Sequence, residues 1–210
     1  MEGARGAAPV RIGEMEPGDL RAASRVLGAA FLDDPVWASI GPRRRGRRAI
    51  TNRIAFAGIL AGSRRRDARI RVAQVGGAVA GASIAFEPGR WPLPQASLIW
   101  EIGWLALAGP LPASRALRND SAMRDVHPVH PHMYLWFLGV DRDRHGTGVG
   151  RALLAELHAD SDARRLPTYL ETGTRPNIAF YERDGYEIVG EIEMPSGPRM
   201  WRMERPATGI

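Results

Sequence analysis

The 210-residue chain contains no cysteine and no lysine. Without cysteine, it cannot form disulfide bonds, a cysteine-ligated zinc site or a cysteine acyl-enzyme. All 29 basic residues are therefore arginine, and the 23 acidic residues leave a formal net charge of +6. A basic set made only of arginine suggests a GC-rich bacterial genome.

The sequence also lacks an apolar run long enough to cross a bilayer, because the most apolar stretch, residues 96–110, is interrupted by Glu101. Its first residues, MEGARGAAPVR, contain no apolar signal-peptide core. We therefore expect a cytoplasmic protein with no membrane partner. A chain of this length can enclose one sizeable core, so residues 1–210 are predicted to form a single domain.

Arginine clusters at residues 43–48 and 64–66 flank an apolar segment, 50–60, that is typical of a helix. Such clusters attract polyanions, including nucleic acid. No interleaved pattern of aromatic and basic residues accompanies them. The clusters are interpreted as a solvated helix surface, and a nucleic-acid partner is not favoured.

The most informative segment is LWFLGVDRDRHGTGVG, at residues 135–150. An aromatic and apolar run predicts a strand buried on both faces, and the polar residues 141–144 predict a turn. Val149, Leu153 and Leu157 then follow with helical spacing, which places the glycines at a helix N-terminus. A helix N-terminus has unpaired N–H groups and a partial positive charge, so a phosphate or pyrophosphate is the expected ligand.

Further along the chain, residues 167–172 predict another strand and residues 175–186 a short helix closed by Gly185. Together with the glycine turn, this region resembles the GNAT superfamily of acyl-CoA-dependent N-acyltransferases. The glycine turn resembles the family's Gln/Arg-x-x-G-x-G/A motif, with His145 in place of Gln or Arg. Asn177 to Tyr186 resembles the downstream family motif, with one residue fewer between Asn177 and Phe180. Leu170-Glu-Thr172 and the later motifs look most like the puromycin N-acetyltransferase branch.

The resemblance implies a mixed α/β (α+β) GNAT fold, with a mostly antiparallel sheet that splays where acetyl-CoA inserts and is flanked by helices. It places acceptor-side elements mainly in residues 17–131, the acetyl-CoA core in 132–186 and a C-terminal strand pair in 186–205. The residues expected to bind acetyl-CoA are Leu138, Gly139, Val140, His145, Gly146, Thr147, Gly148, Val149, Gly150, Arg151 and Asn177. No metal is expected.

The strands and helices predicted from local sequence patterns follow the order that the resemblance implies. Strands are predicted at 10–15, 70–75, 78–86, 134–140, 167–172, 186–193 and 199–204. Helices are predicted at 17–31, 50–60, from residue 98, from residue 112, from residue 149 and at 175–186.

Two residues carry the expected chemistry. Tyr181 matches the family tyrosine that gives a proton to the coenzyme A thiolate. Glu171 occupies the position of a glutamate in the puromycin-like branch and is the first candidate for the general base. Because no cysteine is present, the acetyl group would pass directly from acetyl-CoA to an acceptor amine.

The acceptor side is less clearly marked. Asp33 and Asp34 follow the first predicted helix, where they could attract a cationic amine or simply form a turn. Glu101 is a reserve base or an exposed helix residue. The HPVHPH segment at residues 127–132 is interpreted as a structural loop and not as a metal site, because the prolines impose an extended loop and no carboxylate pattern completes a site.

The sequence thus predicts an N-acetyltransferase acting on a primary amine of a small molecule, such as an antibiotic or another natural product. Protein or polyamine acetylation stays open, as does a non-catalytic protein that senses acyl-CoA or binds nucleic acid. A dinucleotide-dependent oxidoreductase is disfavoured, since the glycine spacing differs from G-x-G-x-x-G. The sequence does not specify the acceptor, the acyl-chain length or the oligomeric state, and a homodimer stays open.

Overall fold

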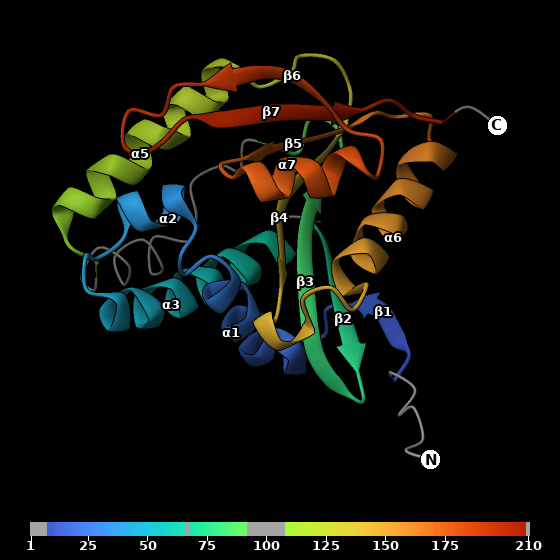
Figure 1. Ribbon diagram of the computed structural model, residues 1–210, viewed down its shortest axis with the longest axis horizontal. Helices are drawn as coiled ribbons and strands as arrows, with labels where there is room; N and C mark the ends of the chain where they lie inside the picture. Colours follow the sequence, from blue (N-terminus) through green and yellow to red (C-terminus); the bar gives the residue numbers. More distant parts are fainter. Residues whose placement is uncertain (1–7, 66–67, 92–107, 209–210) are drawn as a thin grey trace.

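The computed structural model describes residues 8–65, 68–91 and 108–208 (Figure 1). The strands are β1 (Val10–Glu14), β2 (Arg69–Val75), β3 (Ala78–Phe86), β4 (Met133–Val140), β5 (Thr168–Thr172), β6 (Glu187–Ile192) and β7 (Met200–Arg205). The α-helices are α1 (Leu20–Ala30), α2 (Pro35–Ile40), α3 (Arg45–Arg64), α5 (Pro110–Asp125), α6 (Val149–Ala163) and α7 (Arg175–Glu182), with short 3-10 helices η1 (Pro17–Asp19) and η2 (Arg142–Arg144).

The seven strands form one sheet in the order β1-β2-β3-β4-β5-β7-β6. All neighbours are antiparallel except β4 and β5, which run parallel. The mixed, mostly antiparallel sheet flanked by helices that the sequence predicts is confirmed. The predicted hairpin is also present: β2 and β3 are joined by Gly76 and Gly77, whose φ angles of +60° and +81° suit a tight hairpin turn.

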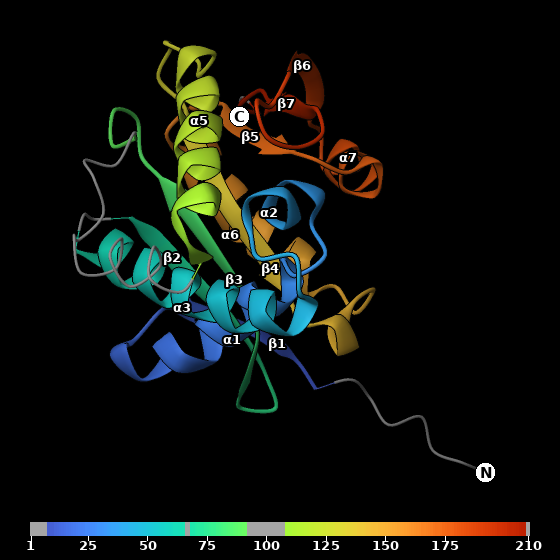
Figure 2. The same ribbon diagram turned by 90° about the vertical axis from the view of Figure 1, so that its left-hand side faces the viewer.

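Strand β4 lies in the middle of the sheet and is buried on both faces, as predicted. Tyr134 and Phe137 pack into the core formed with α1 and α3, whereas Met133 and Leu135 pack with α6 and α7. Helices α1 and α3 therefore cover one face and α6 the other (Figure 1). Helices α2 and α5 lie side by side beyond the edge of this core (Figure 2).

Three helices differ from the sequence prediction. Helix α3 begins at Arg45 and ends at Arg64, so it includes arginines of both clusters, which do not merely flank it. Helix α2 is not predicted at all, because it has only six residues and starts at a proline. Helix α7 ends at Glu182, before the predicted boundary, and Gly185 with φ +87° lies in the turn that follows.

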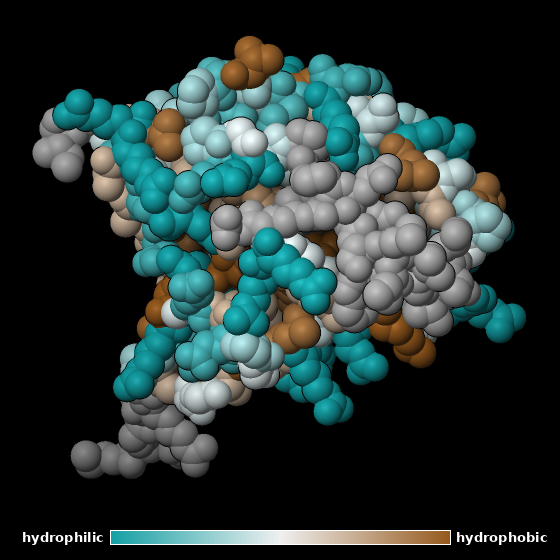
Figure 3. All heavy atoms as spheres, turned by 180° about the vertical axis from the view of Figure 1, so that it is seen from behind, coloured by the Kyte–Doolittle hydropathy of each residue, from teal (hydrophilic) through white to brown (hydrophobic). Residues whose placement is uncertain are grey.

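The predicted helix from residue 98 lies outside the described residues, and so does Glu101. Within the described ranges, no helix combines the length and apolar character needed to cross a membrane. Viewed from behind, the coloured residues are mainly hydrophilic, and hydrophobic residues appear in small separate groups (Figure 3).

Candidate active site

The sheet opens between β4 and β5. These strands pair only at Met133 with Thr168 and at Tyr134 with Tyr169. From Leu135 onward β4 keeps its pairing with β3, up to Val140, while its other edge has no strand partner among the described residues. The splay expected from the resemblance is therefore present, and the β4 edge can pair with an extended amide-bearing ligand.

The glycine turn leads from β4 into α6. Gly146 and Gly148 have φ angles of +73° and +87°, which side-chain-bearing residues rarely adopt. Gly148 is the N-cap of α6, and no side chain caps this helix end. The first N–H groups of α6 are thus available to an anion and carry the positive end of the helix dipole. This backbone fits the pyrophosphate of coenzyme A.

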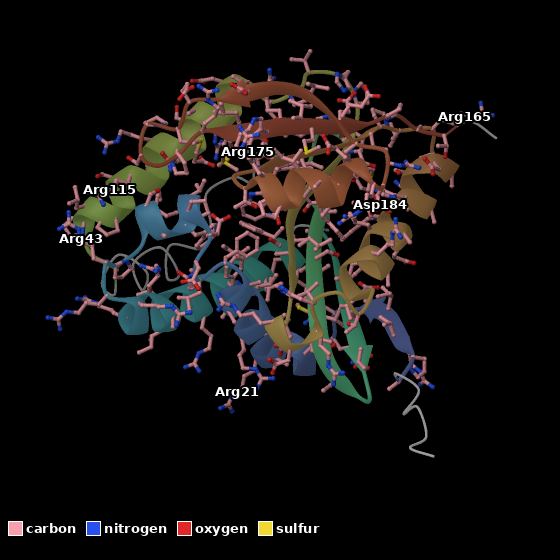
Figure 4. The ribbon with its side chains drawn as sticks, viewed as in Figure 1. Arg21, Arg43, Arg115, Arg165, Arg175 and Asp184 are labelled. Atoms are coloured by element: carbon pink, nitrogen blue, oxygen red, sulfur yellow. The ribbon has the colours of Figure 1, made fainter. Side chains whose placement is uncertain are left out.

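Several side chains around the turn already interact with other groups of the protein. The His145 Nε2 atom lies 3.3 Å from the Val140 carbonyl oxygen, so the ring folds back toward the end of β4. Arg151 forms an ion pair of 3.1 Å with Asp184, which lies between α7 and α6 (Figure 4). Thr147 is exposed, and its hydroxyl donates to the Arg144 carbonyl.

A cavity of about 350 Å³ lies beside the open edge of β4. Its walls come from the segment that follows α1, from α2, α3, α5, β4, β5, α7 and β7, and from Met194 after β6. Most of its lining is apolar or aromatic, including Phe31, Trp37, Trp136 and Phe137. Its polar lining residues are Asp34, Asn119, Asp120, Tyr134, Glu171, Thr172, Asn177 and Tyr181.

Tyr181 and Asn177 reach this cavity from the same helix, α7. Their spacing of one helical turn puts both side chains on one face. Tyr181 is 8% exposed, and burial raises the pKa of its hydroxyl above the ordinary value. The hydroxyl therefore stays protonated at neutral pH.

Glu171 reaches the cavity from β5. Its side chain is only 4% exposed, and its Oε2 atom accepts a hydrogen bond of 2.7 Å from the Tyr134 hydroxyl. Its Oε1 atom is buried without a close hydrogen-bond partner among the described residues, and the Tyr169 hydroxyl, whose pKa is raised by burial and by the Glu171 charge, is a second donor beside this carboxylate. Burial and the nearby Glu171 charge raise the pKa of Tyr134 well above its usual value, so Tyr134 acts as a hydrogen-bond donor.

The structure places a residue near Glu171 that the sequence analysis does not assign to the site. His127 lies on the loop after α5, with its Nδ1 atom 3.9 Å from Glu171 Oε1. The HPVHPH segment is thus a structural loop that also packs against the candidate base. No local motif predicts this contact, because it depends on the pairing of β4 with β5.

The two aspartates that follow α1 have different surroundings. Asp34 lines the cavity and caps α2, since its Oδ1 atom accepts hydrogen bonds of 3.0 Å from the backbone N–H groups of Val36 and Trp37. Burial raises the pKa of Asp34.

Asp33 lies outside the cavity lining and forms ion pairs with Arg45, Arg48 and Arg142. The arginines hold the pKa of Asp33 well below its usual range, with hydrogen bonds from Arg45 and Arg142 as the main cause. Its charge is therefore already compensated within the protein.

The first arginine cluster lies at a second cavity, of about 450 Å³, where α3 and α5 begin. Arg43, Arg44, Arg47 and Arg115 contribute to its lining. Figure 4 shows Arg43 and Arg115 at this end of the molecule and Arg165 at the opposite end. Among the described residues, no group of three or more His, Asp or Glu side chains is arranged to hold a metal ion.

Comparisons with known proteins agree with this geometry. Residues 117–188 match the family model of the acetyltransferase (GNAT) domain. This segment runs from within α5 to the start of β6 and contains the glycine turn, Glu171, Asn177 and Tyr181.

One curated relative, the 5-NmdU N-acetyltransferase of Pseudomonas phage PaMx11, is 33% identical over 61 residues, which are 29% of this chain. The match spans 44% of that relative, less than half of its length.

Solved structures resemble the whole chain. A Corynebacterium glutamicum protein described as histone acetyltransferase HPA2 and related acetyltransferase has a TM-score of 0.74 at 21% identity, covering 96% of this chain and 98% of that one. The ribosomal-protein-S18-alanine N-acetyltransferase of Escherichia coli has a TM-score of 0.56 at 17% identity, covering 96% of both chains. The chain therefore has the GNAT fold, and its residues 117–188 match the model of the GNAT acetyltransferase domain.

Proposed function

We propose that this protein is an N-acetyltransferase that moves an acetyl group from acetyl-CoA directly to the primary amine of a small molecule. One observation carries the proposal: the open edge of β4, Tyr181 and Glu171 meet at a single cavity. Acetyl transfer needs an anchored acetyl-CoA, a group that deprotonates the amine and a donor near the departing sulfur. The chain offers a candidate for each.

In this proposal the cofactor-side residues act mainly through their backbone. The α6 N-terminus at Gly148 to Arg151 would hold the pyrophosphate, with Gly146 and Thr147 shaping the turn. The edge of β4 from Leu138 to Val140 would pair with the pantetheine amides and donate to the developing oxyanion. His145 and Asn177 would contact the phosphate or pantetheine portion.

The acceptor amine loses a proton to Glu171, and its nitrogen then attacks the thioester carbonyl carbon. A C–N bond forms, the C–S bond breaks, and the sulfur leaves as a thiolate, which takes up the second proton that the attacking nitrogen gives up as the amide forms. A thiol of this kind has a pKa of about 8.5. Since the pKa of Tyr181 is raised, complete proton transfer from Tyr181 would be uphill. Tyr181 therefore stabilises the thiolate chiefly by donating a hydrogen bond.

The cavity favours a small acceptor with an apolar or aromatic body. Its volume of about 350 Å³ lies in the range of small-molecule pockets. Asp34, Asp120 and Glu171 supply the only formal charges in its described lining, all negative, and would attract an ammonium group. Asp33 is a weaker candidate for this role because its charge is already compensated by three arginines.

The proposal leaves the class of acceptor amine to be decided by experiment. The curated relative is named for 5-NmdU, and the Escherichia coli neighbour is named for an alanine of a ribosomal protein. Membership of the puromycin N-acetyltransferase branch is part of the proposal and rests on the motifs at Leu170–Thr172 and Asn177–Tyr186. A cytoplasmic location is part of it as well, and a homodimer is an open alternative.

A non-catalytic acyl-CoA sensor or nucleic-acid-binding protein is the competing proposal. The arginines at the second cavity favour an anionic partner there. In Figure 4, Arg43 and Arg115 lie at one end of the molecule and Arg165 at the opposite end, whereas a nucleic-acid groove needs a continuous basic stripe. Salt-dependent binding of nucleic acid would support this competitor.

The test is calorimetric titration with acetyl-CoA, followed by a thiol-release screen against antibiotic and metabolite amines, polyamines, N-terminal peptides and 5-NmdU. Binding together with release by one amine class supports the enzyme and identifies the acceptor. Binding without release by any amine favours the sensor. Absence of binding overturns the interpretation of the glycine turn and the β4 edge.

A further inference from the structure

The loop behind Glu171 contains a chain of polar contacts. The His132 Nδ1 atom lies 2.8 Å from the His130 carbonyl oxygen, and the His132 Nε2 atom lies 3.1 Å from the His127 Nε2 atom. His127 Nδ1 then faces Glu171 Oε1 at 3.9 Å. His130 continues the chain outward, because its Nε2 atom lies 2.7 Å from a carboxylate oxygen of Glu204.

The partners in this chain assign the ring protons. A carbonyl oxygen only accepts, so His132 Nδ1 must carry a proton. Burial is the main cause that lowers the pKa of His132, which favours the neutral ring and leaves its Nε2 atom as an acceptor. His127 Nε2 must then donate to it. In neutral His127, the Nδ1 atom facing Glu171 therefore carries no proton.

This assignment leaves two buried acceptors facing each other. His127 Nδ1 and Glu171 Oε1 are both buried, and neither has a hydrogen-bond partner among the described residues. Their side chains are 12% and 4% exposed. Unpaired buried polar atoms are costly, and one proton placed between these two atoms would satisfy both.

We propose that Glu171 and His127 act as one base, which takes a single proton from the acceptor ammonium and shares it between Glu171 Oε1 and His127 Nδ1. This inference rests on the proposed function. The N–H bond of the ammonium breaks, its electron pair stays on the amine nitrogen, and the proton passes through the carboxylate to the imidazole. The 3.9 Å separation is that of an ion pair, and catalytic contacts commonly shorten when substrate binds.

His127 is held firmly for this role. The Trp91 ring stacks on it at a centroid distance of 4.1 Å, and Tyr134 and Tyr169 meet it edge-on at 4.8 and 5.2 Å. The Arg124 guanidinium lies 5.7 Å from the Trp91 ring centroid.

Charged and titratable groups around His127 come from every element packed against it. They are Asp120 and Arg124 from α5, His130 and His132 from its own loop, Tyr134 from β4, Tyr169 and Glu171 from β5, and Arg202 and Glu204 from β7. Glu171 is the carboxylate that faces the ring directly, which makes it the partner of the shared proton.

The experiment compares His127→Gln with a matched control, His158→Gln. His158 is another partly buried histidine, and its Nε2 atom lies 3.1 Å from the Tyr186 hydroxyl, remote from the cavity lining. We expect His127→Gln to lower kcat by about 100-fold, at the low end of the contribution of a positioned base. Acetyl-CoA affinity and the unfolding temperature should stay close to those of the control.

The pH–rate profile separates a shared base from a packing role. An isolated imidazole titrates near pH 6.5 and an isolated carboxyl near pH 4.3, so a base that has lost its imidazole should stay active to lower pH. The acid limb of kcat should therefore move to lower pH in His127→Gln and stay unchanged in His158→Gln. A second variant, His132→Gln, should give a smaller loss of kcat, because His127 remains but loses the partner that fixes its tautomer.

A measurement independent of turnover uses protein labelled with ¹⁵N in histidine. At about pH 5, below the pH at which an isolated imidazole takes up a proton, the His127 Nδ1 signal should be that of a protonated nitrogen in the wild-type protein and should move toward that of an unprotonated nitrogen in Glu171→Gln. Unchanged kcat and pH profile in His127→Gln, or an identical Nδ1 signal with and without Glu171, would overturn the shared base. Failure of every amine to release thiol from the wild-type protein would instead overturn the proposed function, and the ¹⁵N comparison would still test the pair.

Discussion

At the scale of single residues, the site contains groups whose chemistry is set by burial. Tyr181 is the clearest case, because burial raises the pKa of its hydroxyl and keeps it protonated. Glu171 has one carboxylate oxygen bound to Tyr134 and the other facing His127. These two residues therefore present a donor and an acceptor to the same cavity, as acetyl transfer requires.

Replacing Tyr181 tests the donor. Tyr181→Phe removes only the hydroxyl and keeps the ring that packs with Phe180 and Tyr186. We expect kcat to fall by about 10²-fold, the usual scale for one general acid or one donor to a developing charge, with acetyl-CoA affinity nearly intact. Steady-state thiol release and calorimetry measure the two quantities. Unchanged turnover would remove Tyr181 from the mechanism.

At the scale of elements, α1 packs very closely on β4, the strand with the open edge. A Cβ atom on Gly139 would lie 2.9 Å from both the Ala30 Cβ and the Leu27 Cδ2 atoms of α1. On the other face, a Cβ atom on Gly81 would lie 2.8 Å from Val149 of α6. The missing side chains therefore let both helices pack directly on the strands that form the site.

Gly139→Ala is expected to destabilise the protein by about 1–3 kcal/mol, because overpacking forces α1 away from β4. The matched control is Gly13→Ala on β1, where an added Cβ atom would have no neighbour within 4 Å. Urea unfolding of the two variants measures the difference. Equal stability of both variants would contradict the close approach of α1.

The turn between β6 and β7 is held beside the cavity, on the side where we propose that the acceptor binds. Buried Asn119 of α5 donates to the Ser196 carbonyl at 2.7 Å and accepts from the Ser196 N–H at 2.9 Å. The Ser39 hydroxyl, on α2, donates to the same carbonyl at 2.7 Å. Hydrogen bonds thus join α2, α5 and the turn between β6 and β7 beside the cavity.

Asn119→Ala should release this turn. The two lost hydrogen bonds, of about 1 kcal/mol each, no longer hold the turn in the conformation that binds the acceptor. We therefore expect the KM of the acceptor to rise by about tenfold or more. The dissociation constant of acetyl-CoA should not change, since the turn lies away from the glycine loop. An increase in both constants would show that the fold, and not the acceptor side, had been disturbed.

Short-range patterns account for what the sequence predicts of this architecture. Gly148 at the start of α6, the glycine pair of the β2–β3 hairpin and the polar turn after β4 are all recognisable from neighbouring residues. Helix α2 escapes prediction because one capping aspartate, Asp34, fixes only six residues. The length of α3 escapes it because its N-terminal turn is rich in arginine and carries no capping side chain.

Long-range contacts account for what the sequence does not predict of the site. The contact between His127 and Glu171 exists because the parallel pairing of β4 with β5 places the loop after α5 behind β5. The ion pairs of Asp33 likewise join α3 and η2, which are distant in sequence. Such juxtapositions follow from the sheet order and not from local periodicity.

At the scale of the whole molecule, α6 and the C-terminal strand pair are joined by polar groups that are buried or partly buried. Arg205 of β7 donates two hydrogen bonds, of 2.8 and 2.9 Å, to Asp162 of α6. His158 lies on the same helix, beside Tyr186. Burial, with the nearby Arg205 charge as a second cause, lowers the pKa of His158 to about 4.

The stability of the whole fold should therefore depend on the protonation of His158. An unfolded histidine has a pKa of about 6.5, so the unfolded chain binds this proton before the folded protein does. The stabilisation is fully present above pH 6.5 and is lost as the pH falls toward 4. Allowing for the partial exposure of the ring, the loss is about 1–2 kcal/mol.

The free energy of unfolding, measured by urea titration at intervals between pH 7 and pH 4, tests this dependence against His158→Gln. Glutamine cannot take up a proton, so the curve of the variant should fall less steeply with acidification, and the gap between the two proteins should narrow toward pH 4. Carboxylates that titrate near pH 4 affect both proteins alike and cancel in the difference. Parallel curves would show that the pKa of His158 is the same in the folded and unfolded chains. The packing of α6 against the C-terminal strands would then not depend on a neutral His158 ring.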